Sequence, residues 1–143
     1  MDNSNQDVKF DGVPSEYLEV TWEGVEPYLT RALARGGQYR TVDILKKLII
    51  KEMQLWIAYK GEYSNPDVQA FCITELNITP LQKECLIVWC SGKERDNWHD
   101  YIKEIEKWAK TRGCDVMKVM TRPGWERVHK TYKKTHSLLE KAI

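Results

Sequence analysis

Four cysteines and three histidines are the side chains of this sequence best suited to nucleophilic or metal chemistry. Cys90 precedes Ser91, which suggests a nucleophile, but no base can be identified beside it. The cysteines form no C-x-x-C pair, and the spacing of His129 and His136 is not typical of a zinc site. We therefore expect no metal, and we interpret the cysteines as reduced thiols.

Basic side chains gather in residues 118–134, where Glu126 is the one acid. Such a patch can bind phosphate groups, nucleic acid or an acidic protein face. No aromatic–basic repeat or recognition helix accompanies it, which argues against a nucleic-acid partner and favours a solvated surface. Over the whole chain, 22 basic and 21 acidic residues give a net charge of +1, which identifies no partner.

The length of 143 residues fits one domain, and a composition with 42% hydrophobic and 30% charged residues excludes a disordered chain. No apolar run reaches the roughly 18 residues that a membrane span needs. Residues 1–10 are polar and lack the apolar stretch of a signal peptide. We therefore expect a protein that is neither secreted nor embedded in a membrane.

The first half of the chain alternates between strand and helix patterns. Residues 1–15 are expected to be a flexible arm, followed by a short strand at Glu16–Thr21. Helical spacing follows from Val25, with Pro27 in the first turn, and Gly36 and Gly37 end this helix. A second helix is expected from Thr41, as its N-cap, to about Met53.

Three apolar runs then predict an antiparallel meander, at Leu55–Tyr59, Val68–Leu76 and Glu84–Cys90. The strongest helical period of the chain runs from Trp98 to Ala109, with Trp108 on its buried face.

Gly113 ends that helix, a strand is expected at Val116–Met120, a short helix at Pro123–Lys130, and a last strand at Thr135–Lys141. The order β-α-α-β-β-β-α-β-α-β predicts a single α+β domain over residues 16–143, with a mixed, mostly antiparallel sheet flanked by helices.

This order resembles the Gcn5-related N-acetyltransferase (GNAT) fold, and local motifs add to the likeness. Glu106–Cys114 resembles the E-x-W-A-x-x-x-G-C end of the family's central helix. Arg122–Val128 and Leu139–Lys141 resemble the R-P-G-W-x-R-V segment and L-E-K ending of small GNAT-like proteins of tailed bacteriophages, and Met53–Ala58 resembles their second strand.

The resemblance implies acetyl-CoA as cofactor, held between the fourth and fifth strands. The strand before the central helix would offer backbone groups to the pantetheine arm, and the helix N-terminus would hold the pyrophosphate. In this chain the implied cofactor residues are those at the end of that strand and in the following loop: Trp89, Cys90, Ser91, Gly92, Lys93 and Arg95.

The phosphate-binding motif Q/R-x-x-G-x-G/A departs from the family pattern. Counting back from Gly113 places Lys93 at its basic position, and Asp96 and Trp98 at its two glycine positions. Side chains there hinder the close approach of the backbone to phosphate, and Asp96 adds negative charge. The motif therefore looks degenerate.

Three residues stand where the family's catalytic groups are found. Glu75 and Glu84, on predicted strands, are candidates for the base that deprotonates the amine, although glutamates are common on solvated sheet edges. Tyr132, just beyond the predicted short helix, is a candidate for the acid, although packing explains it as well.

Two function classes remain open at this point. The first is an N-acyltransferase that moves acetyl from acetyl-CoA to an unknown amine, located in the cytoplasm. The second is a catalytically degenerate GNAT-fold structural or assembly protein of a bacteriophage, located in the virion and bound to other virion proteins. A fold does not determine a function, so the site must decide between them.

Overall fold

The computed structural model describes residues 7–34, 38–93, 98–120 and 129–143. Its centre is a five-stranded sheet with strands in the order β1-β2-β3-β4-β5. The strands are β1 (Lys9–Gly12), β2 (Gln54–Lys60), β3 (Asp67–Ile78), β4 (Lys83–Gly92) and β5 (Val116–Val119). The first four pair antiparallel, and β5 pairs parallel to β4. The predicted mixed, mostly antiparallel α+β fold is confirmed.

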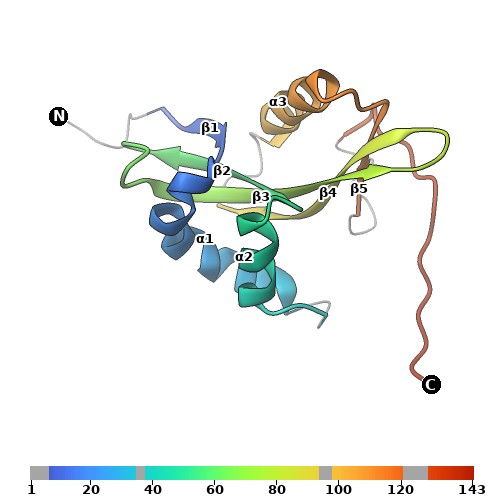
Figure 1. Cartoon of the computed structure of the whole chain (residues 1–143), viewed down its shortest axis with the longest axis horizontal. Coiled ribbons are helices and arrows are strands. Elements are labelled where there is room, and N and C mark those ends of the chain that lie inside the picture. Colours follow the sequence, from blue (N-terminus) through green and yellow to red (C-terminus); the bar gives the residue numbers. More distant parts are fainter. Residues whose placement is uncertain (1–6, 35–37, 94–97, 121–128) are drawn as a thin grey trace.

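Helices cover both faces of this sheet (Figure 1). A 3-10 turn, η2 (Ser15–Tyr17), leads into α1 (Leu18–Leu33), and α1 and α2 (Thr41–Ile49) lie on one face. The third helix, α3 (Trp98–Thr111), lies on the other. A parallel β4–β5 pair needs a long crossover connection, and α3 supplies it.

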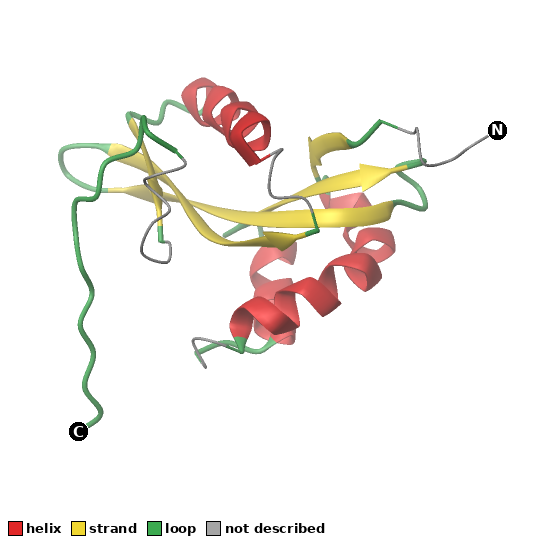
Figure 2. Ribbon diagram, turned by 180° about the vertical axis from the view of Figure 1, so that it is seen from behind, coloured by secondary structure: helices red, strands yellow, loops and turns green. Residues whose placement is uncertain are grey.

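Two apolar clusters hold these layers together. The α1–α2 cluster lies between the sheet and the first two helices, and its fully buried members include Val25, Leu29, Ile44, Ile57, Phe71 and Ile73. The α3 cluster lies on the opposite face, and its buried members are Trp56, Cys72, Cys85, Ile87, Ile102, Ile105 and Ala109. Figure 2 shows the same two layers from behind. No helix in the described part of the chain is long and apolar enough to cross a membrane.

The predicted first strand at Glu16–Thr21 is wrong. These residues form η2 and the first turn of α1, and the first strand is β1, inside residues 1–15 that the sequence predicts to be an arm. Because Leu18 and Thr21 are buried on the same face as Val25, helical spacing overrides the short alternation. Pro27 accordingly lies inside α1 rather than in its first turn.

Several element ends also differ from the prediction. Arg40, not Thr41, is the N-cap of α2, which ends at Ile49 rather than near Met53. The predicted strand at Thr135–Lys141 is wrong, since these residues are exposed and have no regular secondary structure. Trp108 is only partly buried, against the prediction. The segment Gly36–Gly37 and most of the predicted helix Pro123–Lys130 lie outside the described residues.

Candidate active site

A bulge at Val88 divides strand β4 into two parts. In the pairing with β3, Ile87 lies opposite Thr74 and Trp89 lies opposite Ile73, so Val88 has no partner there. An extra residue of this kind reverses the faces to which the following side chains point. Cys85 and Ile87 accordingly belong to the α3 cluster, whereas Trp89 packs against the α1–α2 cluster.

The pairing between β4 and β5 stops at the same point. Glu84 to Ile87 pair with Val116 to Val119, and the amide of Met120 donates to the carbonyl oxygen of Ile87 at 3.4 Å. Beyond Ile87, β4 continues to Gly92 with no β5 partner among the described residues. Among the described residues, the last part of β4 therefore has an unpaired edge, to which an extended ligand could bind.

Backbone groups of Cys90 and Gly92 face this open edge. The amide of Lys93 donates to the carbonyl oxygen of Gln69 on the β3 side, at 2.9 Å. Backbone groups of alternate residues point to opposite edges of a strand, so those of Cys90 and Gly92 point away from β3. These are the groups that could pair with an extended ligand arm, as a further strand would.

Gly92 allows two backbones to approach closely at this end of the sheet. It lies opposite Ala70, and a Cβ atom at position 92 would stand 2.5 Å from the Cα atom of Ala70 and 2.7 Å from the carbonyl oxygen of Gln69. Both are backbone atoms that cannot turn aside.

Trp98 packs nearby, with its ring edge-on to Tyr101 at 5.6 Å, so the ring is held in the core.

Replacing Gly92 by alanine should lower the free energy of unfolding by about 1–3 kcal/mol, the usual cost of forcing atoms into a packed region. Gly12→Ala is the matched control, because its new Cβ atom would meet the Trp56 ring at an ordinary 3.6 Å. Urea unfolding of both variants measures the difference. Equal free energies for the two variants would show that the β3–β4 end can open without cost.

The loop after Gly92 is only partly described. Lys93 is exposed, and its amide is already bonded to Gln69, so only its side chain is free to meet a phosphate. Arg95 and Asp96 lie outside the described residues. Their predicted roles, together with the degenerate phosphate motif, stay predictions.

An aromatic and acidic group lies on the α1–α2 face of the same strands. The Trp89 ring meets Tyr39 edge-on at 5.5 Å. The pKa of Lys47 is raised, chiefly by its hydrogen bond to Glu52 and also by nearby Tyr39 and Glu75. Glu75 lies opposite Leu86, next to the Thr74–Ile87 pair where β4 and β5 part. It has no hydrogen bond or ion pair with another described residue.

Glu84 is placed less well for catalysis. It lies at the other end of β4, with 7% of its surface exposed, and its carboxylate binds the Lys118 ammonium at 2.9 Å. The carboxylate is thus already occupied by a cation, at the end of β4 that is paired with β5. Of the two predicted bases, Glu75 is therefore the one close to the open edge.

Tyr132 lies against α3. Its hydroxyl donates to the Glu106 carboxylate at 2.7 Å, and its ring packs against the α3 cluster. Burial, followed by the bond to Glu106, raises the pKa of Tyr132, so its hydroxyl stays protonated at neutral pH. The contact explains Tyr132 as a packing and anchoring residue, and its role as an acid stays a prediction.

His129 also packs against α3, through His99. It is 6% exposed, its ring stacks on that of His99, and its pKa is lowered, first by burial and then by His99. The unfolded chain therefore takes up a proton more readily than the folded one. Stability is full above the ordinary pKa of 6.5 and is lost as the pH falls below it.

We expect the thermal unfolding midpoint to drop between pH 7.5 and pH 5 and to drop less in His129→Phe, which keeps a ring and removes the titration. His136→Gln, at an exposed site, should retain the wild-type slope. Parallel pH profiles for wild type and His129→Phe would show that another group controls the loss.

The thiols show little nucleophilic character. Burial raises the pKa of Cys90 to about 11, so a thiol rather than a thiolate is present at neutral pH. Cys85 is raised to about 12 by the same cause. All four cysteines are free thiols. Within the described ranges, no group of three or more metal-ligating side chains gathers.

Comparison with solved structures decides the fold family. An aminoglycoside acetyltransferase from an uncultured soil metagenomic sample, in complex with sisomicin, superimposes with a TM-score of 0.71 at 8% identity, over 95% of this chain and 96% of that chain. A predicted acetyltransferase from Clostridium acetobutylicum with acetyl-CoA gives 0.64 at 15% identity, over 95% and 96%.

The aminoglycoside acetyltransferase AAC(6')-Iy, bound to a bisubstrate analogue of CoA, gives 0.68 at 12% identity, over 96% and 98%. This chain has the GNAT fold. No family model matches the sequence, and no curated protein is significantly similar to it.

In the GNAT fold of this chain, the predicted cofactor residues divide between two faces. Cys90 packs toward the α3 side, and Trp89 packs toward α1 and α2. The implied separation of the fourth and fifth strands is not found along β5, because all four of its residues pair with Glu84 to Ile87 of β4. Beyond Ile87 the described residues do not test it. Sequence reasoning missed Tyr39, which comes from the α1–α2 connection and is placed by its contact with Trp89.

Proposed function

We propose that this chain is an acyl-CoA-dependent N-acyltransferase that moves acetyl from acetyl-CoA to an amine. One observation carries the proposal: β4 runs on from Val88 to Gly92 after its pairing with β5 has ended. A strand edge without a neighbouring strand suits an extended ligand with amide groups, and the pantetheine arm of CoA is such a ligand.

The cofactor would lie on the α3 side of this edge. Backbone groups of Cys90 and Gly92 pair with its amides, and the Lys93 side chain approaches its pyrophosphate together with the N-terminal end of α3. Neighbours of the same fold are described with acetyl-CoA and with a bisubstrate analogue of CoA, which supports this choice of cofactor.

The amine would approach from the opposite face, beside Trp89, Tyr39 and Glu75. The amine nitrogen attacks the thioester carbon, an N–C bond forms, and the C–S bond breaks. Glu75 takes the proton that the nitrogen loses. The CoA sulfur leaves as a thiolate, which is a good leaving group because the thiol has a pKa of about 8.5. The thiolate then takes a proton from water.

Calorimetric titration with acetyl-CoA tests the cofactor site. We expect saturable binding to the wild type and a loss of about tenfold or more in Lys93→Glu, since the exchange places a negative charge near the pyrophosphate. Lys103→Glu, on the exposed side of α3, makes the same charge change at a distance and should bind as the wild type does. No binding to the wild type would refute the proposal.

Acetyl transfer is then measured as release of free CoA, with sisomicin and an alanine-terminated peptide as probe amines. One structural neighbour is an aminoglycoside acetyltransferase in complex with sisomicin, which makes sisomicin a suitable first probe. Product formation that needs both acetyl-CoA and the amine supports an enzyme.

The degenerate bacteriophage component stays the second candidate. Tyr132, the predicted acid, has its hydroxyl bonded to Glu106, which favours a protein without that catalytic group. The structural neighbours above do not support a virion role. Acetyl-CoA binding without transfer to any probe, together with recovery of the protein in purified particles, would favour this candidate over the enzyme.

A further inference from the structure

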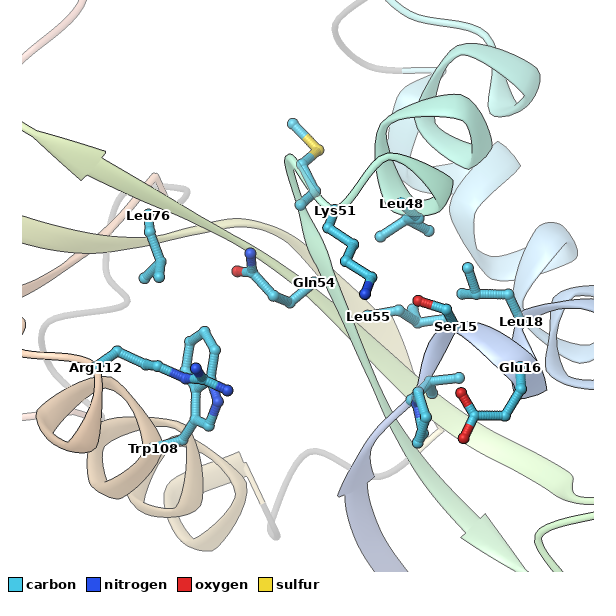
Figure 3. A pocket seen from close by; sticks show the side chains of 13 residues that line it. Ser15, Glu16, Leu18, Leu48, Lys51, Gln54, Leu55, Leu76, Trp108 and Arg112 are labelled. Atoms are coloured by element: carbon cyan, nitrogen blue, oxygen red, sulfur yellow. The ribbon is translucent and has the colours of Figure 1, made fainter.

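A cavity lies at the start of β2, apart from the last part of β4. It has a volume of about 470 Å³ and opens where β2 begins, between η2, the end of α2 and the last turn of α3 (Figure 3). Small-molecule sites commonly have volumes of about 300–1,000 Å³. Gln54 and Leu55 line it and pair with Thr74 and Ile73 of β3. Cys90 and Gly92 of β4 pair with Cys72 and Ala70, closer to the start of β3.

The backbone of Lys51, which lines this cavity, has an unusual conformation. Its φ is 64°, and it is the one non-glycine residue with a positive φ in the described part of the chain. It lies just after α2, where the Lys51 amide donates a hydrogen bond to the carbonyl oxygen of Leu48 at 3.2 Å. The Glu52 amide donates to the carbonyl oxygen of Lys47 at 2.9 Å. Glycine is the usual residue at such a position, so a lysine here gives up stability.

The Lys51 side chain also contributes a positive charge to the cavity. In Figure 3 the Lys51 ammonium points toward Ser15 and Leu55, inside the cavity. Arg112, the residue after the end of α3, also lines the cavity, with its guanidinium 5.5 Å from the centre of the Trp108 ring. Neither cation forms an ion pair with another described residue. Lys51, just beyond the end of α2, and Arg112, just beyond the end of α3, therefore line one cavity, in which Glu16 is the single lining carboxylate.

Gln54 adds a hydrogen-bond donor with a fixed orientation. The Trp56 indole N–H donates to the Thr74 hydroxyl at 3.1 Å, and that hydroxyl donates to the Gln54 side-chain oxygen at 2.9 Å. The Gln54 oxygen is thereby occupied. Its NH₂ group has no hydrogen-bond partner among the described residues and is available to an acceptor.

The remaining wall of the cavity is apolar. Leu48 and Leu55 line one side, and Leu76 and the Trp108 ring line the other. Cationic and donor groups at one place, with aliphatic and aromatic walls around them, complement a molecule with one anionic end and an apolar body.

We propose that this cavity binds a monocarboxylate with an apolar chain. The carboxylate lies between Lys51 and Arg112 and accepts a hydrogen bond from Gln54, while the chain lies along Leu48 and the Trp108 ring. Glu16 leaves a net positive charge too small for a second ligand carboxylate, so a monoanion binds in preference to a dianion.

Octanoate is the probe, titrated into ¹⁵N-labelled full-length protein. We expect saturable shifts of the Gln54 side-chain NH₂ and Trp108 indole resonances. Octan-1-ol, which lacks the charge, and the dianion suberate should bind about tenfold more weakly or not at all. Equal affinity for octanoate and octan-1-ol, or no octanoate binding at millimolar concentration, would overturn the proposal.

Lys51→Gly separates ligand binding from folding. Glycine relieves the positive φ, so the unfolding midpoint should rise while octanoate affinity falls about tenfold. Lys46→Gln, a neighbouring exposed lysine on α2 that does not line the cavity, should change neither. A raised midpoint with unchanged octanoate affinity would show that Lys51 serves only to end α2, and would refute the ligand site.

Arg112→Gln tests the second cation from the other side. Octanoate affinity should fall, while Lys110→Gln, two residues earlier on α3, retains it. Acetyl-CoA should leave the Gln54 and Trp108 resonances unmoved in all variants. The outcome therefore does not depend on whether the proposed acyltransferase activity exists.

Discussion

Glu75→Gln should lower kcat for acetyl transfer by about 10²–10⁴-fold, the usual contribution of a positioned general base, while the Kd for acetyl-CoA stays unchanged. Glutamine keeps the shape of the side chain and removes its ability to take a proton. Glu75 stands on the side of the sheet from which the amine is proposed to approach, next to the last pair before the β4–β5 pairing ends. Steady-state kinetics together with calorimetry measure the two effects separately.

Glu84→Gln is the matched control on the neighbouring strand. Its carboxylate is held by Lys118 at the far end of β4, so the exchange should reduce stability and leave kcat within a few-fold of the wild type. An equal loss of kcat in both variants would assign the effect to a general weakening of the sheet. Full activity in Glu75→Gln would remove Glu75 as the base.

The long elements of the fold were predictable because their patterns are long. The apolar run Leu55–Tyr59 lies in β2, where all five residues are buried. A short, continuous apolar run is the pattern of a fully buried strand, so no alternation was needed to predict it. In α3, Ile102, Ile105 and Ala109 repeat at helical spacing, and Gly113 follows with a φ of 80°, which glycine adopts readily.

The N-terminal region was predicted wrongly because its elements depend on distant partners. Strand β1 has four residues and exists because it pairs with Trp56 to Tyr59 of β2. Phe10 alone gives it apolar character, through stacking on Trp56 and Tyr101. A sequence pattern reports local spacing, and it contains no information on which edge of a sheet remains to be covered.

The candidate site was predictable only in part. Its place at the end of β4 followed from the resemblance, but the bulge at Val88 could not be recognised, because Leu86 to Trp89 are all apolar and show no alternation. That bulge decides which face receives Trp89. Tyr39 escaped notice for a related reason: it precedes α2 in a connection whose path only the tertiary contacts fix.

Phe71→Ala should lower the free energy of unfolding by about 3–5 kcal/mol, the range for a buried aromatic side chain truncated to alanine. The ring is fully buried in the α1–α2 cluster, and its backbone lies between Ile57 of β2 and Ser91 of β4. Denaturant unfolding gives the value, with the dependence on urea compared to confirm that unfolding remains two-state.

Ile78→Ala is the control on the same strand, since Ile78 is 80% exposed and should change stability by less than about 0.5 kcal/mol. The effect of Phe71→Ala should also reach the proposed cofactor site, because Phe71 lies opposite Ser91, in the part of β4 that has no β5 partner among the described residues. Only β3 holds that part of β4 in place among the described strands. We therefore expect weaker acetyl-CoA binding in Phe71→Ala even where the variant is fully folded; unchanged affinity would show that the open edge is held without support from the core.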